Sequence, residues 1–189
     1  MITKLKLTNF KNLKQAEINF GPVSILVGAN ATGKSNVRDA LRFLHGIARG
    51  YTLAEIIGEK YGEGGQLQWS GIRGGTRETC FYGERTFSIG VEFVQRRGSP
   101  SYSTPYAYEI EVCCGPNGSA PRVVKESLSC YGTTIYYSEP GANAAEQIDP
   151  MHLVARLPSG GNWRKTGPKL PGIANQPLLT KDIARLHES

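Results

Sequence analysis

The pattern of apolar and polar positions predicts three β-strands at the start of the chain. Residues 4–8 and 15–20 place an apolar side chain at every second position, which is the period of a strand with one buried face. The polar run 9–12 between them is typical of a turn. After a Gly-Pro break, residues 23–27 are apolar almost throughout, as expected for a strand buried on both faces.

A helix is expected next, because the spacing changes after residue 35. The apolar positions recur every three or four residues, at Val37, Ala40, Leu41, Leu44, Ile47 and Ala48. The polar positions on the other side of this helix are Arg38, Asp39, Arg42 and Arg49. Gly50 is a plausible stop signal. Residues 1–50 are therefore expected to form the core of one unit.

The rest of the chain divides into three segments by pattern. Residues 51–78 are glycine-rich, with a short helical possibility near their start, and are expected to be a flexible loop segment. Residues 79–137 alternate repeatedly between turn signals, which predicts an antiparallel β lobe. Residues 138–189 are loop-rich, with one short hairpin around 151–163 and the start of a helix at the end.

The junction between the third strand and the helix carries the main chemical signal. Residues 28–35 read G-A-N-A-T-G-K-S, which fits the phosphate-loop pattern G-x-x-x-x-G-K-[ST]. Glycines let the backbone wrap tightly, so that N–H groups and a helix N-terminus point at an oligophosphate. Lys34 would reach the β- and γ-phosphates, and the Ser35 hydroxyl would be a ligand of Mg²⁺. The sequence therefore predicts a nucleotide-phosphate site.

Composition adds the broad class. The 189 residues are 39% hydrophobic and 20% charged, which is typical of a globular protein. The sequence has no apolar run near the roughly 18 residues of a membrane span and no signal-peptide pattern at its start, so no membrane partner and a cytoplasmic location are expected. The four cysteines lack the spacing of a zinc site and are expected to be reduced structural thiols.

The formal charge of +6 is spread unevenly. Residues 1–50 carry eight Lys/Arg against two acids, residues 51–150 carry eight against twelve, and residues 151–189 carry six against two. The basic ends fit the phosphates of a nucleotide or of nucleic acid, but a solvated surface with one phosphate site is the preferred interpretation.

The run KLKLTNFKNLKQAEINFGPVSILVGANATGKSNVRDALRFL resembles the start of ABC-type ATPase heads of the SMC, RecF and Rad50 group. It is especially similar to the single-chain AAA-type relatives found in DNA repair and phage defence. The matching features are a strand ending in NF+N, a second strand, GxNxxGKSN and a helix of the form xxDALRFL.

The resemblance implies an α/β fold of the P-loop NTPase class, with an ABC-ATPase-like mixed sheet and an antiparallel β lobe. It implies ATP and Mg²⁺ as cofactors, Lys34 as the catalytic residue and Ser35 as the metal ligand. The implied nucleotide-binding residues are Gly28, Ala29, Asn30, Ala31, Thr32, Gly33, Lys34, Ser35, Asn36 and, in the strand turn, Lys11.

Two catalytic parts of such heads are missing. The sequence has no apolar strand ending in Asp-Glu, the Walker B motif that holds Mg²⁺ and polarises the attacking water. Residues 157–161, L-P-S-G-G, resemble the signature loop, but the following residues are a poor helix start, and a hairpin turn is the preferred interpretation. We therefore expect an incomplete head, the N-terminal half of an ATPase.

The expected partners are a second ATPase head, as a homodimer or as the missing C-terminal half, and DNA or a defence effector protein. ATP binding and hydrolysis by dimerised heads would then drive a DNA-related process of repair or phage defence. The alternatives are a self-sufficient small kinase or phosphotransferase and a nucleotide-gated interaction module without turnover. A GTPase is opposed by the absence of D-x-x-G and N-K-x-D motifs.

Overall fold

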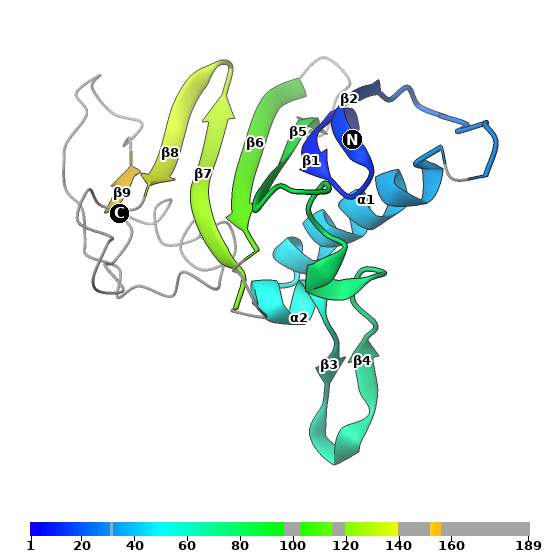
Figure 1. The fold of residues 1–189 in the computed structure, drawn as a ribbon. Coiled ribbons are helices and arrows are strands. Elements are labelled where there is room, and N and C mark those ends of the chain that lie inside the picture. The colour runs from blue at the N-terminus through cyan, green and yellow to red at the C-terminus, as the bar shows by residue number, and fades with distance from the viewer. Residues whose placement is uncertain (31, 97–102, 115–119, 140–151, 156–189) are drawn as a thin grey trace.

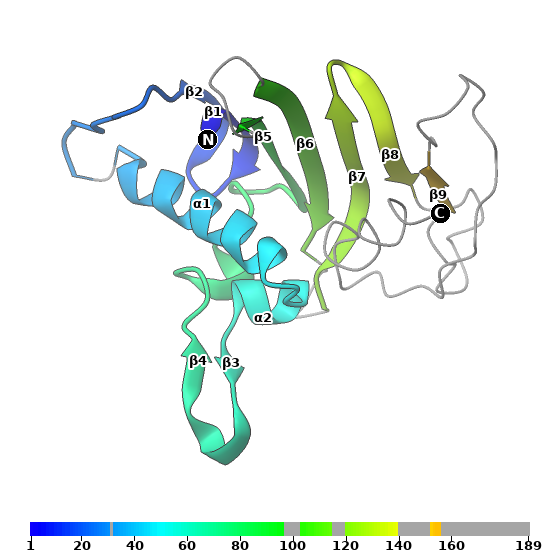
Figure 2. The ribbon, with the colours of Figure 1, turned by 180° about the vertical axis from the view of Figure 1, so that it is seen from behind.

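The structure is a computed structural model, and it describes residues 1–30, 32–96, 103–114, 120–139 and 152–155. These residues form a seven-stranded sheet with a long helix on one face (Figure 1) and a small two-stranded hairpin that projects away from it, as the view from behind also shows (Figure 2). Among the described residues, no helix has the length and apolarity needed to cross a bilayer.

The large sheet has the strand order β2-β1-β5-β6-β7-β8-β9, and every pairing recorded within it is antiparallel. Its strands are β1 Ile2–Phe10, β2 Leu13–Asn19, β5 Thr86–Arg96, β6 Ser103–Cys113, β7 Arg122–Cys130, β8 Thr133–Glu139 and β9 His152–Ala155. The antiparallel strands predicted from alternation are confirmed. The parallel part of the expected mixed sheet is not found among the described residues.

Matching alternation sets the register of the central strands. Leu7 on β1 lies opposite Ile89 on β5, which lies opposite Ile110 on β6, and all three side chains are buried on one face. The hairpin between β7 and β8 turns through Tyr131 and Gly132, whose φ values of 49° and 71° suit a tight two-residue turn.

Helix α1, Lys34–Ala48, packs across this apolar face. Phe43 is fully buried, and its ring lies edge-on to Phe87 of β5 at a centroid distance of 5.5 Å. One expectation for α1 was wrong. Asp39 was expected on the solvated side, but it is only 2% exposed. Its burial is tolerated because two neighbouring cations neutralise its carboxylate.

The segment that follows α1 is more structured than expected. It contains α2 Leu53–Ile57, β3 Lys60–Tyr61, β4 Leu67–Trp69, and the 3₁₀ turns η1 Glu63–Gly65 and η2 Gly75–Arg77. The short helix suggested by the sequence is confirmed, and Thr52 and Glu55 close it with a capping box. The loop expected after it is partly replaced by the β3–β4 hairpin, because Trp69 is buried and anchors β4.

The buried third strand predicted over residues 23–27 is wrong in this structure. These residues form no strand, and Val23, Ile25 and Val27 are 82%, 81% and 88% exposed. No recorded strand pairing involves this segment within the part of the chain that the structure describes. Without a described strand beside them, its apolar side chains stay exposed to solvent.

Several predictions fall on other parts of the chain. The signature-like run 157–161, the helix start near the end and Ala31 of the phosphate loop lie outside the described residues. Of the hairpin expected around 151–163, the structure describes only the strand β9.

Candidate nucleotide-binding site

Two glycines fix the shape of the loop over residues 28–35. Gly33 directly precedes α1 with a φ of 96°, and a Cβ atom there would approach Leu13 Cδ2 to 2.9 Å. A Cβ atom at Gly28 would lie 3.1 Å from the Thr32 hydroxyl oxygen and 3.8 Å from Lys34 Nζ. A side chain at Gly28 would therefore crowd the Thr32 hydroxyl, while its distance to Lys34 would be an ordinary van der Waals contact.

The side chain of Lys34 folds back into this loop. Its ammonium group donates hydrogen bonds to the carbonyl oxygens of Gly28 and Ala29. The Thr32 hydroxyl donates to the Ala29 carbonyl at 2.9 Å. These contacts are all with neutral acceptors, and no carboxylate of the described residues forms an ion pair with Lys34.

The N-terminus of α1 is suited to an anion. Gly33 provides no side-chain cap, and the first turn of α1 contains no acidic residue. The first N–H groups of a helix lack intrahelical partners and carry a partial positive charge, which favours phosphate. Ser35 lies in this first turn with an exposed side chain, so its hydroxyl fits the role of a Mg²⁺ ligand beside phosphate oxygens.

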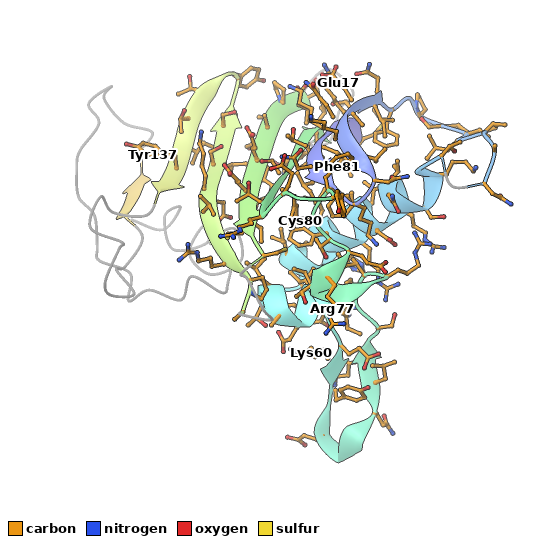
Figure 3. All side chains as sticks on the ribbon, viewed as in Figure 1. Glu17, Lys60, Arg77, Cys80, Phe81 and Tyr137 are labelled. Carbon is orange, nitrogen blue, oxygen red and sulfur yellow. The ribbon has the colours of Figure 1, made fainter. Side chains whose placement is uncertain are left out.

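These groups border one cavity of about 650 Å³. Four segments line it, namely the β1–β2 turn, the phosphate loop, the start of α1 and the segment before β5. Its lining residues are Lys11, Asn12, Asn30, Gly33, Lys34, Ser35, Asn36, Arg73, Arg77, Glu78, Cys80, Phe81 and Tyr82. Figure 3 labels three members of the last segment, Arg77, Cys80 and Phe81. The cavity has the size of a small-molecule site.

An ion-pair network forms the wall of this cavity beside α1. The buried carboxylate of Asp39 accepts from Lys11 Nζ at 3.0 Å and from Arg73 Nη2 at 3.0 Å. Lys11 also donates to the Arg73 carbonyl at 2.5 Å, and Arg73 Nη2 donates to Asn36 Oδ1 at 3.3 Å. One carboxylate thus holds two cations that come from segments far apart in the sequence.

Comparison with known proteins gives a match in the part of the chain that contains this loop. Residues 1–56 match the family model of the AAA ATPase domain. The resemblance to AAA-type ATPases predicted from the sequence is confirmed over these residues at the level of this family model.

One solved structure with a detectable match is that of the recombination mediator protein RecF with ATP in the RecFOR pathway. The identity is 17% over 70% of this chain and 27% of that chain, with a TM-score of 0.37. The chain thus spans about a quarter of the length of that protein. The comparison with curated proteins found no match.

Within this ATPase-like region, the structure gathers most of the predicted site residues. Asn30, Gly33, Lys34, Ser35, Asn36 and Lys11 all line the cavity. Lys11 does so with a side chain only 7% exposed and already paired with Asp39. Its predicted role toward the nucleotide, like those of the loop residues, stays a prediction.

Arg73 was not identified from the sequence. Its side chain is 54% exposed and lies at the cavity, so it is better placed than Lys11 to meet a ligand. The only available signal was a single arginine in the run G-I-R-G-G, whose glycines suit a sharp turn. Gly71 and Gly74 adopt positive φ values of 65° and 77° and so give this run its shape.

Two thiols complete the description of the cavity wall. The four cysteines at described positions are free, as predicted. A hydrogen bond from the Cys114 thiol lowers the pKa of Cys80, and the same bond, together with burial, raises the pKa of Cys114. Cys80 lines the cavity, so its reactivity is a direct probe of access to the site.

Proposed function

We propose that this chain supplies the ATP-binding part of an SMC/RecF-like ABC-class ATPase. The supporting observation is that Lys34 and the N-terminus of α1, which lie in the region that matches an AAA ATPase domain, converge with Arg73 on one cavity. In this proposal residues 28–36 hold the phosphates of Mg·ATP.

Each residue has a separate task in this site. The Lys34 ammonium exchanges its carbonyl partners for β- and γ-phosphate oxygens, which attract it more strongly because they are charged. The Ser35 hydroxyl binds the metal, and Arg73 offers its exposed guanidinium to the phosphates. Bound Mg²⁺ would neutralise part of the phosphate charge.

We propose further that the catalytic site is completed by a second half, within a longer chain or in another polypeptide. The exposed apolar residues 23–27 support this proposal, because they have the composition of a buried strand and pair with no strand in the part of the chain that the structure describes. Two such heads would then couple ATP hydrolysis to DNA repair or phage defence in the cytoplasm. As an isolated chain, the protein should bind nucleotide but hydrolyse it poorly.

Calorimetric titration with Mg·ATPγS tests the binding proposal. Lys34→Ala should weaken binding at least 10-fold, because the variant loses a cation that contacts the phosphates directly. The matched control is Lys14→Ala, which removes an exposed lysine of β2 that does not line the cavity. Equal affinities of the two variants for Mg·ATPγS would contradict the assignment.

Phosphate release by the purified chain tests the half-site proposal. We expect a rate close to that of uncatalysed ATP hydrolysis, because nothing among the predicted site residues activates water. Rapid turnover by the isolated chain would instead favour the self-sufficient phosphotransferase.

A further inference from the structure

The exposed charge of α1 is entirely positive. Arg38, Arg42, His45 and the C-cap residue Arg49 follow one another at intervals of three or four residues, so they lie along one side of the helix. The only acidic residue of α1 is Asp39, which is buried and paired with cations. No carboxylate of α1 therefore neutralises this row.

Trp69 of the β3–β4 hairpin holds the middle of the row in place. The Arg42 guanidinium lies over its ring at 4.5 Å, and His45 meets the same ring edge-on at 5.6 Å. Arg42 also donates to the Ser70 hydroxyl at 2.6 Å, and the indole N–H donates to the Ile56 carbonyl at 3.1 Å. These partners are neutral, so they order the cations without cancelling their charge.

Tyr51 acts in the same way at the end of the row. Arg49 lies over its ring at 5.7 Å and Lys60 at 4.4 Å. Lys60 is also paired with Glu55 at 2.7 Å, so its charge is already balanced, whereas no ion pair is recorded for Arg49 within the described residues.

The row borders a hollow of about 490 Å³ that is separate from the nucleotide cavity. The four basic side chains form most of its lining, together with Leu41, Gln68 and Trp69. Among the described residues, the lining contains no acidic side chain. The Arg42 Nε atom is buried and has no hydrogen-bond partner, so the guanidinium keeps an unused donor.

We propose that this hollow and the basic row beside it bind the phosphate backbone of a nucleic acid strand. From Arg38 to Arg49 the helix rises by about 16 Å, which equals the axial rise of about five base pairs of a duplex at about 3.4 Å each. Guanidinium groups also present paired donors that suit phosphate oxygens.

Two further observations favour nucleic acid over an acidic protein, and a backbone contact over a base contact. Leu41 is the only aliphatic side chain that the described residues contribute to the lining, whereas the core of a protein interface is usually richer in apolar groups. Trp69 is only 4% exposed, so it orders the arginines and does not stack on bases. Binding should therefore be insensitive to sequence.

The inference that the partner is a nucleic acid rests on the proposed function, whereas the location of the binding surface is inferred from the contacts of α1 and Trp69. The test is fluorescence anisotropy of the purified chain with labelled 20-nucleotide single-stranded and duplex DNA over a range of salt concentrations. Arg38→Gln/Arg42→Gln/Arg49→Gln should weaken binding at least 10-fold and reduce the log–log salt slope for duplex by about two to three.

The matched control is Lys14→Gln/Arg122→Gln/Lys125→Gln, which removes three exposed positive charges from the large sheet. It should keep most of the affinity. The double variant Arg38→Gln/Arg49→Gln leaves the Arg42–Trp69 contact intact, so a loss of DNA binding there is not due to disturbed packing.

The triple variant of Arg38, Arg42 and Arg49 should still bind Mg·ATPγS, and Lys34→Ala should still bind DNA. Failure of the nucleotide proposal can therefore be distinguished from failure of the DNA proposal. Affinity and salt slope equal to those of the unmodified chain would overturn the inference. Displacement of DNA by polyglutamate at equal charge concentration would also overturn it, in favour of an acidic protein partner.

Discussion

Strand β5 and residues 23–27 have similar apolar character but opposite environments. In β5, Phe87, Ile89 and Val91 are buried between β1 and β6 and beneath α1. Residues 23–27 have no recorded strand on either side and are exposed, although they are the more continuously apolar of the two. An apolar run therefore becomes a strand only where other segments satisfy its backbone and cover its side chains.

The largest expected effect comes from the buried side of this comparison. Phe87→Ala should destabilise the chain by about 3–5 kcal/mol, because Phe87 packs against Phe10 at 5.4 Å and Phe43 at 5.5 Å and its loss leaves a cavity. Urea unfolding followed by circular dichroism measures the change. A loss below about 1 kcal/mol would mean that β5 is not the centre of the core.

Substitution of Asp39 tests whether the Lys11 ammonium is buried beside α1. Asp39→Ala should cost about 3–5 kcal/mol, because it leaves the Lys11 ammonium buried without its counter-charge. Arg73→Gln should cost much less, because the Arg73 side chain is half exposed. Similar unfolding free energies for both variants would show that Lys11 reaches solvent.

The capping box of α2 should have an intermediate effect. Thr52→Ala should cost about 1 kcal/mol, because the Thr52 hydroxyl accepts from the Glu55 backbone N–H and caps the helix. Thermal unfolding at neutral pH, compared with the exposed-site control Lys14→Ala, measures this loss. A change no larger than that of the control would contradict the capping role.

Glu55 makes the stability of the same cap pH-dependent. Burial opposes its ionisation, but hydrogen bonds from Lys60 and Thr52 outweigh this and lower the pKa of its carboxyl group. Its contribution is therefore present above the unfolded pKa of about 4.3 and is lost as the pH falls through the lower folded value. The stability difference between the unmodified chain and Glu55→Gln should shrink across that acid range, and a constant difference would contradict this assignment.

The exposed segment should show the smallest effect on stability. Ile25→Ser/Val27→Ser should change the unfolding free energy of this chain by less than about 0.5 kcal/mol, because both side chains are already in water. The same change should abolish association with the proposed second half. A loss of stability comparable with that of Phe87→Ala would show that the segment is buried within the chain itself.

Local pattern was sufficient to predict much of the fold and the loop of the site. Alternation at residues such as Leu5, Leu7 and Ile89 predicted strands, because the period of two reports directly which side chains share a face. The pattern of the phosphate loop also indicated Gly33, whose left-handed conformation is a property of the local backbone. Pattern could not place Arg73, because its partner Asp39 is 34 residues away in the sequence.

The sequence by itself determined the alternating strands, the amphipathic helix and the glycine turn that precedes it, since each depends on neighbours within a few residues, whereas the phosphate-binding role of residues 28–35 stays a prediction. Only the tertiary structure decided which apolar segments are buried, that Asp39 holds Lys11 and Arg73 together, and that Trp69 orders the basic row of α1. The physical reason is that burial and ion pairing are relations between segments distant along the chain. Residues 23–27 show this most clearly, because their composition alone predicts a buried strand and the absence of a neighbour leaves them in water.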